Sequence, residues 1–129
     1  MLIKIIIAIA LGLLIGAERE KTGKVIGIRT TSLISLTTCL FCLMSPNVFN
    51  GDNSRIIAQI VSGLGFLGAG VIFKNEDGIH GLTTAATVFA TGAIGCLVGI
   101  GMFEEAIAGT IAIIIINIAF KYFKQDYNK

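Results

Sequence analysis

Charged residues are almost absent from five long stretches of this 129-residue chain. The five stretches hold 91 residues but one charge, Lys4, whereas the other 17 of the 18 charged residues lie in the remaining 38 positions. A helix of roughly 20 apolar residues crosses the hydrocarbon core of a bilayer, which is about 30 Å thick. We therefore predict one all-α membrane domain over residues 1–129, a bundle of about five transmembrane helices, with four as the nearest alternative. The predicted spans are residues 2–17, 30–49, 56–73, 82–103 and 106–120.

The composition excludes most other classes of protein. Hydrophobic residues make up 54% of the chain and charged residues 14%, whereas about a quarter of a soluble domain is charged. A small domain cannot bury that much apolar surface in water, so the expected partner is a lipid bilayer. A net charge of +2 is too weak to indicate a nucleic-acid partner.

The distribution of basic residues predicts how the helices are oriented. With five spans, the first and third loops and the C-terminal tail lie on one side of the membrane. Eight basic residues fall on that side and only Lys4 and Arg55 on the other, which is a clear positive-inside bias. We expect the N-terminus outside and the C-terminus in the cytoplasm. The eight are Arg19, Lys21, Lys24, Arg29, Lys74, Lys121, Lys124 and Lys129.

Glycines recur at spacings that let membrane helices approach closely. The first and fourth predicted spans each contain a Gly-x-x-x-Gly pair, and the third contains four glycines, which predict either close crossing or local unwinding. Three of those four have the spacing of the Gly-x-Gly-x-x-Gly dinucleotide-binding fingerprint. The strand that should precede that motif and the acidic residue that should follow it are both missing. We therefore predict no cofactor. The predicted packing glycines are Gly12, Gly16, Gly63, Gly65, Gly68, Gly70, Gly95 and Gly99.

A polar stripe follows the third predicted span. Asp52, Arg55, Gln59 and Ser62 are spaced by three, four and three residues, so they share one face of a helix. Because hydrocarbon satisfies no polar group, we expect this face to turn toward the bundle interior or a water-filled cleft. The simpler alternative is that Asp52 and Arg55 pair at the interface while Gln59 bonds a neighbouring helix.

Further candidate functional residues lie at the predicted cytoplasmic ends of the helices. Alternating spans bring these ends together, so their mixed charges would form a surface that a partner could recognise. In the last span, Thr110 and Asn117 share a face and are interpreted as a packing seam. No set of residues with catalytic or metal-ligand spacing is present, so no catalytic residue and no metal are predicted. The candidates at the helix ends are Glu18, Arg19, Glu20, Arg29, Thr83 and Thr84.

Four segments resemble the MgtC/SapB family of bacterial inner-membrane proteins. They are residues 16–20 (GAERE), 27–30 (GIRT), 55–70 (RIIAQIVSGLGFLGAG) and 81–86 (GLTTAA). The resemblance covers about residues 2–120 and implies a multi-pass bundle in the inner membrane. It links the chain to adaptation to low magnesium and to survival inside hosts. Some family members are reported to restrain the F-type ATP synthase.

The chain also departs from the family pattern. Thr31, Asn53 and Phe89 stand where the family often has His, Pro and Trp. Many members continue into a cytoplasmic regulatory domain, whereas this sequence ends nine residues after Phe120, so functions that depend on that domain are not expected of it.

Three functional hypotheses follow from the residues and the resemblance. The favoured one is a non-enzymatic regulatory protein that binds other membrane complexes, such as the ATP synthase, with a homo-oligomer as a further candidate. The alternative is a transporter of a cation (Mg²⁺) or of protons along the Asp52–Ser62 stripe, although Mg²⁺ sites usually supply more carboxylates than Asp52 alone. A membrane enzyme has the least support.

Overall fold

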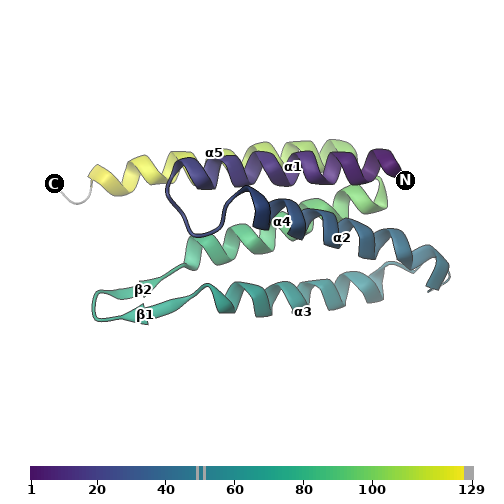
Figure 1. The fold of residues 1–129 in the computed structure, drawn as a ribbon, viewed down its shortest axis with the longest axis horizontal. Coiled ribbons are helices and arrows are strands. Elements are labelled where there is room, and N and C mark those ends of the chain that lie inside the picture. The colour runs from purple at the N-terminus through teal and green to yellow at the C-terminus, as the bar shows by residue number, and fades with distance from the viewer. Residues whose placement is uncertain (49, 51, 127–129) are drawn as a thin grey trace.

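Five helices and one short hairpin make up the part of the chain that the structure describes (Figure 1). The structure is a computed structural model and describes residues 1–48, 50 and 52–126. The antiparallel hairpin pairs Phe73 with His80 and Asn75 with Gly78. The elements are α1 (Leu2–Lys21), α2 (Ile28–Val48), α3 (Ser54–Gly70), β1 (Phe73–Asn75), β2 (Gly78–His80), α4 (Leu82–Ile100) and α5 (Phe103–Asp126).

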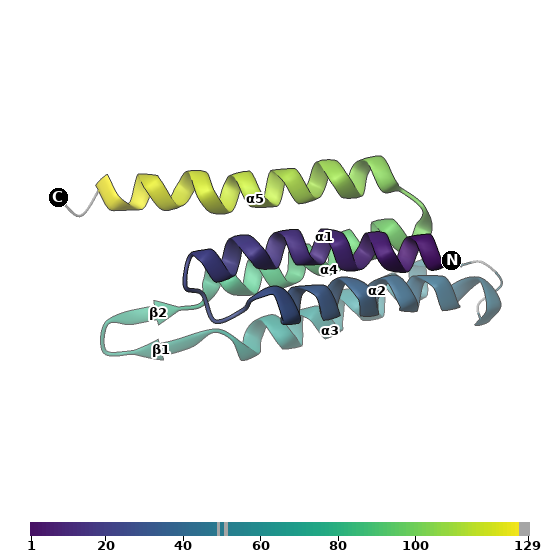
Figure 2. The same cartoon turned by 45° about the horizontal axis from the view of Figure 1, so that its top comes forward.

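The helices run alternately up and down along one long axis (Figures 1 and 2). The α1–α2 loop, the β1–β2 hairpin and the C-terminal end of α5 lie at one end of the bundle, and the N-terminus lies at the other (Figure 1). The segments with the predicted excess of basic residues therefore share one end. The orientation of that end in a membrane stays a prediction.

The helical class is confirmed, and three of the five helices are long and apolar enough to cross a membrane. These cover Ile28–Pro46, Leu82–Ile100 and Phe103–Tyr122. α3 is apolar but shorter, and α1 carries Lys4 and four charged residues at its C-terminal end. The exact number of spans among the described residues therefore stays a prediction.

Several predicted span ends differ from the observed helix ends. The third span was expected to reach residue 73, but α3 ends at Gly70 and the chain enters the hairpin. The fourth was expected to reach residue 103, but α4 ends at Ile100, because Gly101 adopts a left-handed φ of 91° that breaks the helix. α5 consequently begins at Phe103 and not at residue 106.

Helices α1, α2 and α4 form the core of the bundle. Ser35 of α2 donates a hydrogen bond of 2.7 Å to the Ala8 carbonyl of α1, which requires the two helices to lie close together. On the adjoining side of α2, Thr38 and the Ser35 carbonyl lie against Gly95 of α4. The buried apolar residues between these helices and α5 are Ala8, Leu11, Ile15, Cys39, Ile94, Val98 and Ala106.

Four of the predicted packing glycines lie directly against a neighbouring helix. A Cβ atom on Gly12 would lie 2.8 Å from the Thr31 carbonyl oxygen, and one on Gly99 would lie 2.6 Å from the Cys42 Cβ. Gly16 meets Ile28 and Thr31 in the same way, and Gly95 meets α2. These positions confirm that the glycine pairs of α1 and α4 allow close packing.

Three glycines of α3 do not pack against another helix of this chain. A Cβ atom on Gly63, Gly65 or Gly70 would meet nothing within 4 Å, and α3 is a continuous helix without local unwinding. Only Gly68 faces a neighbour, at an ordinary contact distance of 3.6 Å from the Ala85 carbonyl oxygen. The reason is that α3 turns Ile60, Leu64 and Gly68 toward the bundle, which leaves the other glycines exposed.

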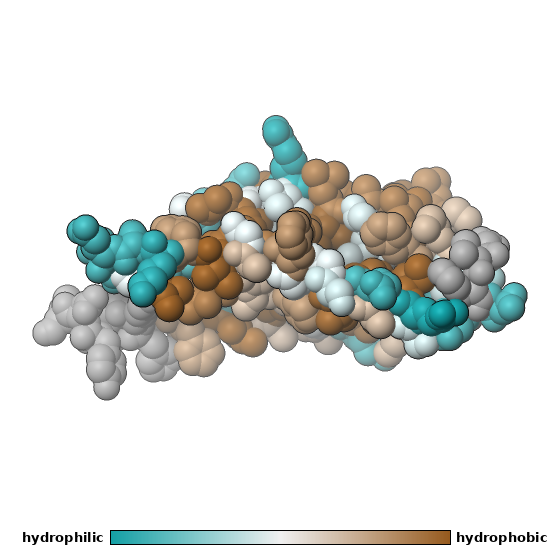
Figure 3. All heavy atoms as spheres, turned by 90° about the horizontal axis from the view of Figure 1, so that it is seen from below, coloured by the Kyte–Doolittle hydropathy of each residue, from teal (hydrophilic) through white to brown (hydrophobic). Residues whose placement is uncertain are grey.

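The distribution of side chains on the surface is that of a protein surrounded by lipid. Figure 3 shows hydrophobic side chains over the middle of one face, with hydrophilic ones gathered mainly toward the two ends. Lys4, the one charge inside the predicted spans, donates a hydrogen bond of 2.8 Å to the Gly99 carbonyl near the C-terminal end of α4. That end of a helix carries unsatisfied carbonyls and attracts a cation, so Lys4 is accommodated.

We predict that Gly12→Leu destabilises the bundle by about 1 to 3 kcal/mol, because the new side chain collides with the backbone of α2. Gly65→Leu is the matched control and should leave stability nearly unchanged, since Gly65 faces open space. Unfolding of the two variants in detergent, followed by circular dichroism, measures the difference. Equal stability of the two would contradict the packing of α1 on α2.

Candidate functional site

Two charged residues near the C-terminal end of α1 are buried. Glu18 is 8% exposed and Arg19 2% exposed. Arg19 Nη2 donates a hydrogen bond of 2.9 Å to Thr84 Oγ1 in the first turn of α4. Charges are rarely buried without partners because the loss of hydration is costly. Glu18 and Arg19 therefore need partners from neighbouring helices. They lie at the end of the bundle that carries the basic segments.

Asn117 of α5 completes a polar network across three helices. Its Nδ2 atom lies 3.3 Å from Glu18 Oε2 and 3.4 Å from Thr87 Oγ1 of α4. The Thr87 hydroxyl has one proton and donates it to the Thr83 carbonyl at 2.8 Å, so it accepts from Asn117. Glu18, Arg19, Thr84, Thr87 and Asn117 are called the polar network below.

The polar network is not fully satisfied. Glu18 Oε1 and Arg19 Nε are buried and have no hydrogen-bond partner among the described residues. The network can therefore accept one more hydrogen bond at the carboxylate and donate one more at the guanidinium. Buried polar atoms without a partner are rare in folded proteins and call for an explanation, which makes this the best-defined candidate site in the structure.

The sequence predicted three of the five members of the network. Glu18, Arg19 and Thr84 were candidates, and the fold brings them together from α1 and α4. Thr87 was not recognised, and Asn117 was interpreted as part of a packing seam. Asn117 is the one amide within an otherwise nearly apolar span, and that isolation is the signal that could have identified it.

The other candidates at this end lie outside the network. Glu20, Arg29 and Thr83 are exposed. The Glu20 side chain lies over Gly27 in the α1–α2 loop, and Arg29 stands at the start of α2. They share the end of the bundle with the network but do not contribute side chains to it.

The structure contradicts one of the two directions predicted for the polar stripe of α3, the bundle interior. Asp52, Arg55, Gln59 and Ser62 are all exposed and do not face the bundle interior. The reason is the same as for the glycines of this helix: Ile60, Leu64 and Gly68 occupy the side that packs on the bundle. Gln59 instead lies at the edge of an apolar groove between α2 and α3.

Asp52 has a structural role at the start of α3. Its Oδ1 atom accepts hydrogen bonds from the Ser54 hydroxyl at 2.6 Å and from the Ser54 backbone N–H at 2.9 Å. These bonds, aided by the positive charge of Arg55, hold the pKa of the Asp52 carboxyl below its ordinary value. Asp52 therefore stays ionised at neutral pH and stabilises the N-terminal turn of the helix.

Metal ligands do not cluster in the part of the chain that the structure describes. Across residues 1–48, 50 and 52–126, no three His, Cys, Asp or Glu side chains lie close enough to hold an ion. Cys39, Cys42 and Cys96 are free and buried in the helix bundle.

Comparison with known proteins identifies the family. The sequence model described as MgtC family matches residues 5–126. Protein MgtC of Salmonella typhimurium is 41% identical over 128 residues, which cover 99% of this chain and 55% of that protein. The chain belongs to the MgtC family.

Other relatives agree with this assignment. Protein MgtC of Brucella abortus is 45% identical over 112 residues, covering 85% of this chain and 47% of the relative. A Synechocystis protein without an assigned function is 41% identical over 122 residues, which cover 93% of this chain and 52% of that protein. This MgtC-family chain spans about half the length of the curated relatives that it matches. No solved structure gives a significant match.

We predict that Thr84→Val lowers the free energy of unfolding of this MgtC-family protein by about 1 to 3 kcal/mol. The substitution keeps the shape of the side chain but removes the acceptor for the buried Arg19 guanidinium. Thr83→Val is the matched control on the adjacent, exposed residue and should have little effect. Denaturant titration of both variants in detergent distinguishes them, and an unchanged Thr84→Val variant would contradict the network.

Proposed function

We propose that this MgtC-family chain is a non-enzymatic regulatory membrane protein, which acts by binding another integral membrane protein through the outward face of α3. One observation carries the proposal. Gln59 and Ser62 are exposed on the apolar helix α3 at the side of the bundle, and neither side chain has a hydrogen-bond partner among the described residues.

The outward face of α3 has the composition of a helix-packing surface. Ala58, Ser62, Gly65 and Ala69 are all exposed and lie on the side of α3 opposite Ile60 and Leu64. Small residues allow another helix backbone to approach closely. Polar groups that hydrocarbon would leave unsatisfied can then bond across the new contact. A helix of a partner protein would meet both requirements.

The identity of the partner is proposed from the family resemblance. We place the chain in the bacterial inner membrane as a multi-pass protein and propose a role in adaptation to limiting magnesium or in virulence. The F-type ATP synthase is the membrane complex that the resemblance suggests. Because this chain spans about half of its curated relatives, the activity of a full-length relative is a proposal here.

The geometry gives less support to transport. A cation or proton path along Asp52, Gln59 and Ser62 would need these side chains to line an enclosed channel. They lie on the surface of the bundle instead, so one chain does not enclose a path along this stripe.

We expect a photo-crosslinking residue placed at Ser62 to capture a subunit of the ATP synthase in membranes grown with limiting magnesium. The same residue at Ile115, which is exposed on α5, is the matched control and should capture lipid only. Mass spectrometry of the crosslinked bands identifies the partner. Capture restricted to a second copy of this chain would overturn the regulatory proposal and indicate a homo-oligomer.

We also expect no ion flux from the purified protein in liposomes. Proton and Mg²⁺ flux measured with pH-sensitive and Mg²⁺-sensitive dyes should equal the flux in empty vesicles, because the polar side chains of α3 lie outside the bundle. Flux that disappears in Gln59→Leu would show that this stripe conducts and would favour the transporter alternative.

A further inference from the structure

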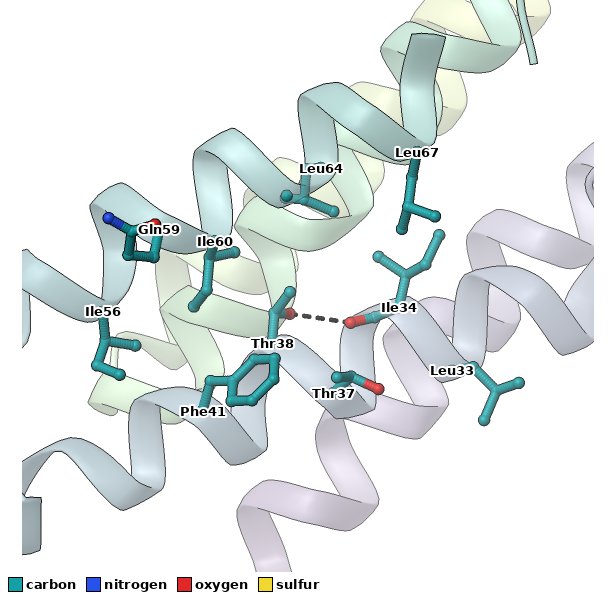
Figure 4. A pocket seen from close by; sticks show the side chains of 11 residues that line it. Leu33, Ile34, Thr37, Thr38, Phe41, Ile56, Gln59, Ile60, Leu64 and Leu67 are labelled. Carbon is teal, nitrogen blue, oxygen red and sulfur yellow. Dashed lines mark hydrogen bonds between the residues drawn. The ribbon is translucent and has the colours of Figure 1, made fainter. Parts of the chain in front are cut away.

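A groove runs along the surface between α2 and α3. Its cavity volume is about 530 Å³. Figure 4 shows Ile56, Ile60 and Leu64 of α3 turned toward Thr38 and Phe41 of α2 across this space. The lining is apolar apart from Gln59 and two threonine hydroxyls of α2. The Thr38 hydroxyl donates its hydrogen bond to the Ile34 and Ser35 carbonyls of its own helix. The groove therefore presents a hydrocarbon-like interior that opens on the outside of the bundle.

A second hollow continues the groove toward the end of the bundle that carries the basic segments. Its volume is about 220 Å³, and it shares Leu33, Ile34 and Leu67 with the first hollow. Arg29 and Thr30, in the first turn of α2, line its far part. The apolar groove thus ends at an exposed guanidinium and a hydroxyl.

The dimensions of the groove fit one hydrocarbon chain. Along α3 the first hollow extends from Ile56 to Leu67, a segment that rises by about 17 Å. That length is close to one leaflet of the hydrocarbon core, about 15 Å. Dividing about 530 Å³ by this length gives a mean cross-section of about 30 Å². The groove is therefore long and narrow, a shape that an extended acyl chain can follow.

We propose that an anionic phospholipid binds here, with one acyl chain in the groove between α2 and α3 and its phosphate at Arg29 and Thr30. The acyl chain covers the apolar walls, and the guanidinium pairs with the phosphate through charge-assisted hydrogen bonds. Basic pockets between membrane helices on the cytoplasmic side commonly bind anionic head groups. This lipid site adjoins the outward face of α3 and meets it at Gln59, but the two surfaces differ elsewhere, because Gly63 lines the groove while Ser62 and Gly65 do not.

Native mass spectrometry of the detergent-purified full chain tests the proposal, with phosphatidylglycerol and phosphatidylcholine as probes. We expect one phosphatidylglycerol to be retained per chain and phosphatidylcholine to bind about fivefold more weakly, since each cation near the head group contributes about that factor. Arg29→Gln should lower the affinity for phosphatidylglycerol about fivefold. Lys24→Gln, which removes one positive charge of the neighbouring α1–α2 loop outside the groove, should not.

A pair of substitutions on α3 tests the position of the acyl chain. Gly63→Phe fills the groove and Gly65→Phe projects elsewhere, and both positions have free space, so both variants should fold. We expect Gly63→Phe to lose the bound lipid and Gly65→Phe to retain it. Equal retention by the two variants, equal binding of the two lipids, or a protein dimer that carries no lipid would each overturn the proposal.

Discussion

Direct contact between helix backbones holds α1, α2 and α4 together, and the rest of the structure depends on it. Helices in hydrocarbon gain nothing from hiding apolar surface, so they associate through van der Waals packing and hydrogen bonds. Gly12 and Gly16 allow α1 to pack closely against α2, and Gly95 and Gly99 allow α4 to do the same. The close approach also brings Ser35 within hydrogen-bond distance of the Ala8 carbonyl. Without these glycines the helices would stand too far apart for that bond.

The same core fixes the register of α1 against α4 and thereby builds the polar network. Lys4 bonds the Gly99 carbonyl at one end of the pair, and Arg19 bonds Thr84 at the other. The two bonds are 15 residues apart on both helices, as a single antiparallel register requires. α5 joins at the Arg19 end, where Asn117 contacts Glu18 and Thr87. The network is therefore a consequence of helix register as much as of residue type.

α3 is attached in a different way, and this explains the two surfaces proposed for binding. It packs on the bundle along one side only, through Ile60, Leu64 and Gly68. One flank leaves an apolar groove beside α2, and the outward side exposes Gln59, Ser62 and small residues. A helix that used all of its apolar surface within the bundle would offer neither surface to a lipid or a protein.

The sequence by itself determined the helical class, the antiparallel succession of the helices and the packing role of Gly12, Gly16, Gly95 and Gly99. These follow from local quantities: the absence of charge over helix-long segments, and four-residue spacing on one helix. It also identified Glu18, Arg19 and Thr84 as candidates.

Only the tertiary structure decided which side of α3 meets the bundle and which polar residues meet one another. Gln59 and Ser62 share a helix face in the sequence, but the rotation of α3 about its axis places that face outside. Asn117 and Glu18 are 99 residues apart, so no local pattern links them. Both outcomes are set by van der Waals packing and hydrogen bonds of one helix against another, and these depend on contacts between segments that are far apart in the sequence.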